Sequence, residues 1–214
     1  MSLASRPLYL DIADVIREKI FQHQLKPGAW INEKEITQEL EISRTPLREA
    51  IKVLAAEGLV TMKIRRGAYV TEVDNQDLVN IFEVISILEA QAAFDVATNA
   101  SENELEQLDN IHTRLEKAAA DRDIDRFFEL NQEFHDLIQQ IAGNPWMRKV
   151  IQDLRQVLKL QRKNSLRKIG RVEQSLLEHR KIMSALIDRK PEQAKLLMNS
   201  HLLQGQRAAT KGKD

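Results

Sequence analysis

Residues 42–51 read ISRTPLREAI and have the features of a helix start. Ser43 or Thr45 can cap the helix, and Pro46 is tolerated in its first turn because the first helical N–H groups have no partner within the helix. Four apolar residues then recur at helical spacing: Leu47, Ala50, Ile51 and Leu54. The stretch therefore predicts an amphipathic helix.

Two more helices are predicted before this one. Asn32 can cap a short helix that continues through Ile36 and Leu40. An earlier helix is predicted to stop at the strong breaker Lys26-Pro27-Gly28. Its apolar residues at helical spacing are Leu8, Ile12, Val15, Ile16 and Ile20. The chain thus begins with one helix followed by two short helices around a tight turn.

Beyond Gly58 the apolar spacing changes to that of β-strands. Two short apolar segments flank Arg65-Arg66-Gly67-Ala68, a basic connection with a glycine that is typical of a β-hairpin. The apolar residues are Leu59, Val60, Met62, Ile64, Tyr69, Val70 and Val73. A helix, a helix-turn-helix and a hairpin in this order predict a winged helix-turn-helix domain.

Positive charge is concentrated in this domain, although the whole chain has 32 basic and 32 acidic residues. Between Arg44 and Arg66 there are six Lys or Arg side chains against two acids, a net charge of +4. Arg44, Thr45 and Arg48 lie at the helix end that would enter a major groove. Arg65 and Arg66 could reach phosphates or the adjacent minor groove. A solvated cationic face is the simpler interpretation of a basic helix alone, but the winged helix around it favours DNA binding.

After residue 74 the sequence predicts helices and no further strand. The expected ranges are 75–99, 102–120, 124–141, 145–168, 172–188 and 192–209. Their starts are marked by a capping box of Ser101 with Glu104, by Asp123, and by Pro145 and Pro191. We therefore predict a mainly α protein with two domains. The winged helix-turn-helix occupies 1–74, and an all-α bundle of six or seven helices occupies 75–214.

The composition describes a soluble globular chain of 214 residues, of which 43% are hydrophobic and 30% charged. No apolar stretch approaches the ~20 residues needed to cross a bilayer, and the N-terminus lacks the apolar core of a signal peptide. We therefore expect a cytoplasmic protein with no membrane partner. The chain has no cysteine, so any metal must be held by histidine together with carboxylate or amide oxygen.

Three of the five histidines fall on three different predicted helices of the bundle, each within an apolar stripe: His135, His179 and His201. A single histidine on an apolar face is more often a hydrogen-bonded core residue, but three together are harder to dismiss. Asn131 lies one turn before His135 on the same helical face, so an oxygen and an imidazole could meet one ion. Such a set leaves coordination positions open for water or a ligand. We interpret His23 and His112 as surface residues.

The N-terminal domain resembles the DNA-binding domain of the GntR family of bacterial transcriptional regulators. The resemblance covers residues 8–73. It rests on ISRTPLREAI at 42–51, LAAEGLV at 54–60 and RGAYV at 66–70, together with LKPG at 25–28 and NEK at 32–34. It implies that Arg44, Thr45 and Arg48 read the operator and that Gly67 lies at the wing tip. The full set of DNA-binding residues so implied is Lys34, Arg44, Thr45, Arg48, Arg66 and Gly67.

The bundle resembles the ligand-binding domain called FCD, from the FadR branch of the same family, over residues 76–207. The motifs are ELNQEFH at 129–135, AGNP at 142–145, EHR at 178–180 and MNSHL at 198–202. In that family an Asp or Asn and three histidines hold a divalent metal. The resemblance therefore implies a metal bound by Asn131, His135, His179 and His201. Asparagine in place of the commoner aspartate removes one negative charge, and imidazole ligands suit zinc or nickel better than manganese.

Family effectors are often small carboxylates that bind beside or on the metal. Many members have an arginine after a Glu-aliphatic pair in the first bundle helix, whereas Glu83-Val84 is followed here by Ile85. The carboxylate must then use the metal alone or another cation. Arg155 and Arg162 are candidates, and either could equally be a solvated surface residue.

These features predict a bacterial transcription factor, a repressor that acts as a homodimer on an inverted-repeat operator and responds to a small organic acid. The alternative is a metal-dependent enzyme, because three histidines with an open position can activate water. Against it, Glu133 and Glu178 are expected to face away from the ligand set and leave no general base. A third possibility, a nonspecific DNA-coating protein with core histidines, predicts binding that is indifferent to sequence, metal and acids.

Overall fold

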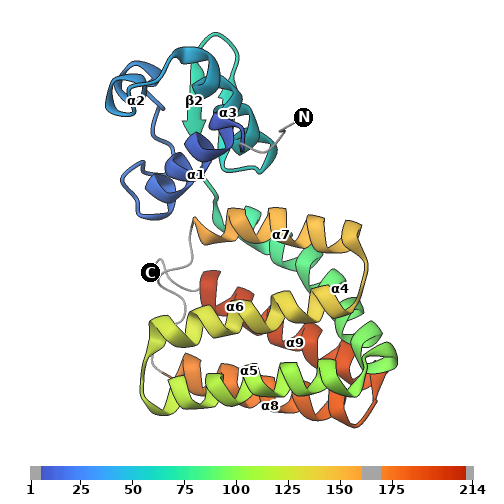
Figure 1. The fold of residues 1–214 in the computed structure, drawn as a ribbon. Coiled ribbons are helices and arrows are strands. Elements are labelled where there is room, and N and C mark those ends of the chain that lie inside the picture. Colours follow the sequence, from blue (N-terminus) through green and yellow to red (C-terminus); the bar gives the residue numbers. More distant parts are fainter. Residues whose placement is uncertain (1–5, 161–169, 211–214) are drawn as a thin grey trace, which may run out of the picture. The chain divides into compact units, whose positions relative to one another are not determined.

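The computed structural model describes residues 6–160 and 170–210, which form nine helices and two strands (Figure 1). The mainly α class predicted from the sequence is confirmed. The chain divides into two compact units: Met1–Asp74 with Asp153–Leu160, and Asn75–Gln152 with Gln161–Asp214. The segment Asp153–Leu160 falls in the range that the sequence analysis assigns to the helical domain.

Three helices form the body of the first unit: α1 (Leu8–Phe21), α2 (Glu33–Glu39) and α3 (Arg44–Ala56). α3 packs against both α1 and α2, because each helix turns its apolar stripe inward. The fully or nearly buried residues are Ile12, Ile16 and Ile20 of α1, Ile36 of α2, and Leu47, Ile51 and Leu54 of α3. Asn32 caps α2 as predicted, since its side chain accepts a hydrogen bond of 3.1 Å from the Lys34 N–H.

The wing is an antiparallel hairpin of β1 (Val60–Lys63) and β2 (Gly67–Val70), joined by a turn of three residues. The chain before α2 lies along the outer edge of β2. The Ile31 N–H donates to the Ala68 carbonyl at 2.9 Å, and the Val70 N–H donates to the Ala29 carbonyl at 2.9 Å. The winged helix-turn-helix predicted from the sequence is therefore confirmed.

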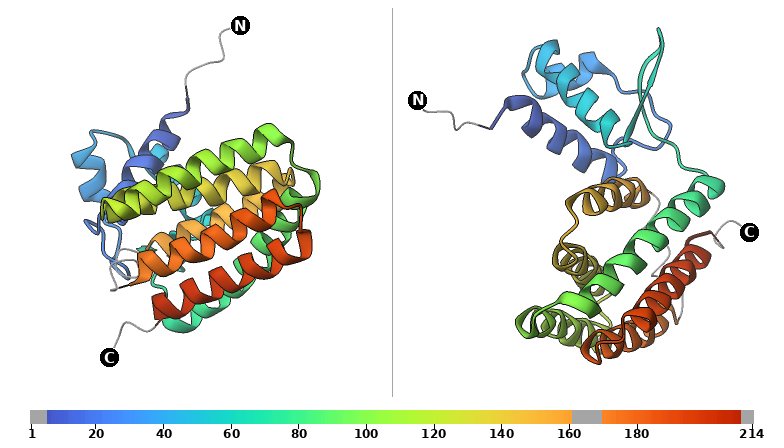
Figure 2. Two further views of the ribbon diagram at one scale, coloured as in Figure 1. Left: turned by 90° about the horizontal axis from the view of Figure 1, so that it is seen from below. Right: turned by 90° about the vertical axis from the view of Figure 1, so that its right-hand side faces the viewer.

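Six helices carry the second part of the chain: α4 (Asn75–Asn99), α5 (Glu102–Ala120), α6 (Ile124–Ile141), α7 (Pro145–Lys159), α8 (Arg171–Ile187) and α9 (Pro191–Thr210). Figure 2 shows α4 and α9 side by side along their length, and α9 also packs against α8. α5 packs against α6 and α8. α4 also packs against α6 and α8, so these helices meet α9 in the interior of the bundle.

The starts of these helices follow the predicted caps. Ser101 and Glu104 form a capping box, in which the Ser101 N–H donates to the Glu104 carboxylate at 2.8 Å. The Asp123 side chain caps α6 through the Arg126 N–H at 2.9 Å. Pro145 and Pro191 are the first residues of α7 and α9.

The predicted end of the fourth bundle helix at residue 168 differs from the structure. α7 ends at Lys159, and Leu160 lies in a turn. Residues 161–169, including Arg162, lie outside the described part of the chain. Within 6–160 and 170–210, no helix is both long enough and apolar enough to span a membrane.

Candidate metal centre and nucleic-acid interface

The three bundle histidines meet in the core of the helical domain. His135 comes from α6, His179 from α8 and His201 from α9, and all three are buried. One ring nitrogen of each lies within 4.8 Å of the others. Side chains separated by up to 66 positions in the sequence are therefore brought to one point by the packing of three helices.

Asn131 is also buried, one helical turn before His135 on α6. Both belong to the inward stripe of α6 together with Phe127, Leu130, Phe134 and Ile138. The shared face is what the four-residue spacing predicts. All four residues named from the sequence as ligands are thus buried, and three of them form one cluster.

Two buried carboxylates, neither of them predicted from the sequence to contact the ligand set, lie against the histidines. Glu89 Oε2 of α4 is 2.7 Å from His135 Nδ1, and Glu178 Oε2 of α8 is 2.6 Å from His201 Nδ1. The expectation that Glu178 faces away is wrong, because its side chain is buried within the bundle. α8 is covered on more than one side, so neighbouring residues on it can both point inward.

The sequence around Glu89 indicates that this carboxylate is buried. It is the one acid in the run from Ile85 to Phe94, which is otherwise apolar or small apart from Ser86 and Gln91. A carboxylate in the middle of an apolar stripe needs a buried partner, since an unpaired buried charge is costly. That partner is on another helix, so local spacing alone does not identify it.

His201 Nδ1 is hydrogen-bonded to Glu178, and the close approach of Glu89 to His135 Nδ1 at 2.7 Å favours the same protonation of that ring. When Nδ1 of an imidazole donates to a carboxylate, its Nε2 carries the lone pair, which is the arrangement found in metal-bound histidines. The Nε2 atoms of His135 and His201 then face each other at 3.3 Å. Two lone pairs at this distance repel unless a cation is shared between them.

His179 is the third histidine of the cluster. Neither of its ring nitrogens has a hydrogen-bond partner among the described residues, although the side chain is completely buried. Its ring packs against Phe134, with 4.8 Å between centroids. Burial, followed by the repulsion of the neighbouring rings, lowers the pKa of His179 well below its ordinary value. The ring is therefore neutral near pH 7, with a buried lone pair that lacks a partner.

The pKa of His201 is lowered as well, first by burial, with the Glu178 carboxylate opposing that shift. Burial raises the pKa of Glu178, but the hydrogen bond with His201 and the charge of Arg171 outweigh it and leave the pKa below its ordinary value. Near pH 7 the rings of His179 and His201 are therefore neutral, while the Glu178 carboxylate is ionised.

These observations fit a divalent metal ion. Zn–N bonds of about 2.0–2.1 Å in a tetrahedral site place ligand nitrogens about 3.3–3.4 Å apart, close to the Nε2 separation of His135 and His201. The unpartnered nitrogen of His179 offers a third ligand, and Asn131 is buried one turn before His135 on the same helix. Glu89 and Glu178 would orient the ligating rings.

One buried cation lies near the cluster. Arg171, the first residue of α8, binds Glu178 through three contacts of 3.3–3.4 Å. Ile85 is buried, so the position where many relatives carry arginine holds an apolar side chain in the core. Arg155 is buried rather than solvated. Arg171 contacts a carboxylate that itself holds a candidate ligand, His201.

The interpretation of His112 as a surface residue is wrong. It is only 7% exposed, and its ring lies 6.4 Å from that of Phe134. Burial lowers the pKa of His112. His112 continues the inward stripe of Leu108 and Leu115 on α5, whereas the neighbouring Asp109 and Glu116 suggested a polar face. His23 is exposed, as predicted.

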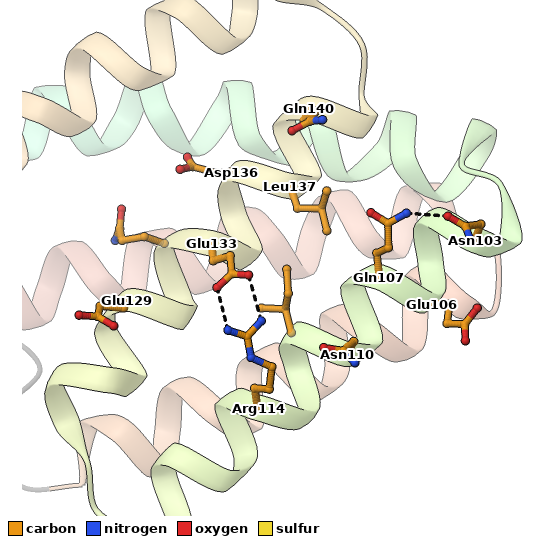
Figure 3. Close-up of a pocket in the computed structure, with 12 residues that line it drawn as sticks. Asn103, Glu106, Gln107, Asn110, Arg114, Glu129, Glu133, Asp136, Leu137 and Gln140 are labelled. Atoms are coloured by element: carbon orange, nitrogen blue, oxygen red, sulfur yellow. Dashed lines mark hydrogen bonds and ion pairs between the residues drawn. The ribbon is translucent and has the colours of Figure 1, made fainter.

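A groove of about 890 Å³ lies between α5 and α6 (Figure 3). It lies outside the histidine cluster, because the α6 residues that line it are on the opposite face from Asn131 and His135. Its charged residues are Glu106, Glu129, Glu133, Asp136 and a single cation, Arg114. Arg114 is paired with Glu133 at 3.0 Å. This acidic groove does not suit a carboxylate.

The predicted DNA-binding residues are all exposed on the winged helix. Arg44, Thr45 and Arg48 lie in the first turns of α3, and Lys34 lies at the start of α2. Ser43 is the N-cap of α3 but makes no side-chain capping hydrogen bond, and the first turn contains no acid. The positive end of the α3 dipole is therefore open to an anion such as a DNA phosphate.

Arg48 is not free in this structure. Its Nε donates to Glu33 Oε2 of α2 at 3.0 Å, across the helix-turn-helix. Both side chains line a groove of about 480 Å³ between α3 and the wing. The pair links the two helices of the motif. An arginine that reads a base must leave this partner.

Gly67 lies beside the wing tip rather than at it. It is the first residue of β2 and is paired with Lys63, whereas Arg65 and Arg66 occupy the turn. Its φ of +94° and the Trp30 indole explain the glycine, because a Cβ here would lie 3.0 Å from Trp30 Nε1.

Comparison with known families matches both halves of the chain. Residues 80–204 match the FCD domain, and residues 8–70 match the bacterial regulatory proteins of the gntR family. The HTH-type transcriptional repressor RspR of Escherichia coli (strain K12) is 30% identical over 200 residues, which are 92% of this chain and 87% of that protein. The uncharacterized HTH-type transcriptional regulator YdhC of Bacillus subtilis (strain 168) is 29% identical over 199 residues, 91% and 88% of the two chains.

Two solved structures share the fold. E. coli McbR/YncC has a TM-score of 0.75 and 21% identity, covering 94% of this chain and 95% of that one. A putative transcriptional regulator GntR from Rhodococcus sp. RHA1 has a TM-score of 0.72 and 21% identity, covering 96% and 99%.

Proposed function

Because the chain belongs to the GntR family of bacterial regulatory proteins and carries an FCD domain, we propose that it is a metal-containing transcriptional repressor controlled by a small organic acid. Regulators of this type bind DNA operators, and the matched relatives are transcriptional regulators rather than enzymes. The alternative of a metal-dependent enzyme is therefore set aside. Relatives named as repressors include RspR and the gluconate operon transcriptional repressor of Bacillus licheniformis, which supports repression here.

The DNA-binding form is a homodimer in the cytoplasm. Helix-turn-helix dimers read inverted repeats because each half-site meets one subunit. Arg44, Thr45 and Arg48 read bases in the major groove, while Lys34, Arg66 and the Gly67 backbone approach the phosphates. The exposed positions of these residues support this division of contacts.

The metal is held by Asn131, His135, His179 and His201. The observation that carries this proposal is the pair of Nε2 atoms facing each other at 3.3 Å, with each Nδ1 against a carboxylate. A bound divalent ion supplies a Lewis-acidic position for an anion. Zinc or nickel suits this ligand set best, because imidazole dominates it.

Charge balance favours an anionic effector. The carboxylates of Glu89 and Glu178 offset the two charges of a divalent ion, and the guanidinium of Arg171 leaves one positive charge in excess. Asn131 adds no charge, unlike the aspartate usual in the family. A buried site with one excess positive charge is stabilised by a small monocarboxylate.

The effector controls DNA binding only if it prefers one arrangement of the dimer. Coupling of ~1–3 kcal/mol between the two sites is typical of such regulators. The acid then binds more tightly to the DNA-incompetent arrangement and releases the operator. The connection around Val73 to Asp77 is the segment whose conformation would change.

Elemental analysis of the purified protein tests the metal, and a thermal-shift screen of small carboxylates with and without chelator tests the effector. We expect roughly one zinc or nickel per chain, and a carboxylate-dependent shift that disappears with chelator. Protein without metal, and without a chelator-sensitive shift, would contradict the proposal. A shift that survives chelator would contradict binding of the acid on the metal.

A further inference from the structure

An isoleucine at the tip of the wing is exposed to solvent. β1 ends at Lys63 and β2 begins at Gly67, so Ile64 is the first residue of the turn between them. Its side chain is 91% exposed, more than any other large apolar side chain among the described residues. An apolar side chain this exposed makes no contribution to the core of the winged helix.

The turn holds Ile64 in a defined position. The Arg66 N–H donates to the Lys63 carbonyl at 3.0 Å, and Arg65 adopts a left-handed φ of +60°. At the base of the turn, Lys63 Nζ lies 4.4 Å from the centroid of the Tyr69 ring. Trp30 packs against Gly67 on the next strand. Ile64 therefore projects from a hydrogen-bonded hairpin.

The surroundings of Ile64 are cationic. Its neighbours Lys63, Arg65 and Arg66 are all exposed, and the turn contains no acid. The groove between α3 and the wing is lined by Lys63 and Arg65 of the wing, by Arg48 and Lys52 of α3, and by one acid, Glu33. This combination matches a DNA minor groove, whose sugar walls are apolar and whose rims carry phosphates.

We propose that Ile64 enters the minor groove beside the half-site that α3 reads, and that it selects against guanine there. The minor-groove edge of a G·C pair carries the guanine 2-amino group, which an A·T pair lacks. An isoleucine on the groove floor packs against A·T pairs and is obstructed by that amino group. The inference rests on the sequence-specific DNA binding proposed above.

The first test compares full-length variants on a duplex that the wild-type protein enriches from a random-sequence pool. Binding is measured by fluorescence anisotropy across a salt series. Ile64→Ser should weaken binding about tenfold, comparable to losing one to two buried methylene groups. Because no charge is lost, the slope of log affinity against log salt should not change. Arg66→Ala, by contrast, should reduce that slope by about one.

Two further variants serve as controls. Ile64→Leu keeps a branched apolar side chain and should retain near wild-type affinity. Leu196→Ser changes another largely exposed apolar side chain, a leucine on α9 that is 71% exposed, and should have no effect. All substitutions are at exposed positions, so thermal unfolding should be unchanged.

The second test replaces guanine by inosine at the base pairs flanking the half-site. Inosine lacks the 2-amino group but keeps the major-groove edge of guanine. The wild-type protein should prefer A·T over G·C flanks and should bind I·C flanks as well as A·T. Ile64→Ser should bind all three flanks with similar affinity.

The outcomes separate this inference from the proposed function. If the wild-type protein enriches no sequence, sequence-specific binding is contradicted, and the role of Ile64 with it. If a sequence is enriched but Ile64→Ser binds it like wild type, or keeps the same flank preference, only the role of Ile64 is contradicted. A changed salt slope in Ile64→Ser would also contradict it, because the effect would then come from the cations.

Discussion

Glu178 of α8 and His201 of α9 are joined in the bundle core by a contact of 2.6 Å between Oε2 and Nδ1. Glu89 of α4 and His135 of α6 repeat this arrangement at 2.7 Å. Each carboxylate anchors one ring from a different helix. The four helices that line the core are thus tied together at the candidate metal centre.

Replacing Glu178 with Gln should weaken metal binding about 10- to 100-fold, the usual effect of losing a carboxylate behind a ligating histidine. The amide can still accept from His201 Nδ1, so the change removes charge more than shape. Competition with a chromophoric chelator measures the affinity. Glu133→Gln on the exposed face of α6 is the matched control and should bind metal like wild type; equal loss in both variants would rule out the role of Glu178.

His179→Ala should abolish most metal binding and make thermal unfolding insensitive to chelator. A metal that binds only the folded protein adds ~2.7 kcal/mol at a free concentration 100 times its Kd, and the variant loses this term. Elemental analysis and melting with and without chelator measure both effects. His112→Ala, another buried histidine, should lose stability but keep its metal. Unchanged metal content in His179→Ala would remove the assignment.

Asn131→Asp should tighten metal binding and weaken the response to carboxylates. The added charge neutralises the excess positive charge that the metal and Arg171 leave in the site. Titration with zinc, followed by the carboxylate thermal-shift screen, measures both. Asn110→Asp on the α5 surface is the control for added charge alone. A variant with stronger acid responses than wild type would contradict the charge argument.

Arg44→Ala should remove operator preference and leave weak, salt-sensitive binding. A bidentate arginine contact with guanine contributes about 1–3 kcal/mol of discrimination, while phosphate contacts persist. Affinities for the enriched duplex and for a scrambled duplex give the ratio. Arg126→Ala, on the exposed surface of the bundle, should leave that ratio unchanged. A wild-type protein that binds both duplexes equally would instead favour a nonspecific DNA-coating role.

The helices of the fold could be predicted from the sequence because their starts are local events. Caps and prolines such as Ser101, Asp123, Pro145 and Pro191 act within one turn of the helix they begin. The sequence predicts too late an end for α7 because no glycine or proline follows Lys159 until Gly170. A helix end without a breaker depends on packing, which local spacing does not reveal.

The candidate site was predicted in part for the same reason. Asn131 and His135 share one face at a spacing of four, and rare histidines in apolar stripes stand out. Glu178 and Arg171 acquire their roles through partners on α9 and on the next turns of α8, and a charged residue is by default expected in solvent. The sequence does not reveal the burial of His112, because the apolar stripe of Leu108 and Leu115 lies only one position away on α5 from the acids Asp109 and Glu116.

In the Arg48–Glu33 pair, the Glu33 carboxylate competes with DNA for the guanidinium of Arg48. An exposed ion pair of this kind contributes at most about 1 kcal/mol, so a cognate guanine easily replaces Glu33 as the partner of Arg48. At a site without guanine, the arginine gains nothing by leaving the carboxylate. The carboxylate then faces the duplex, where phosphates repel it. If Arg48 reads guanine as proposed, the two side chains that join the helices in the free protein would also disfavour half-sites that lack guanine at this position.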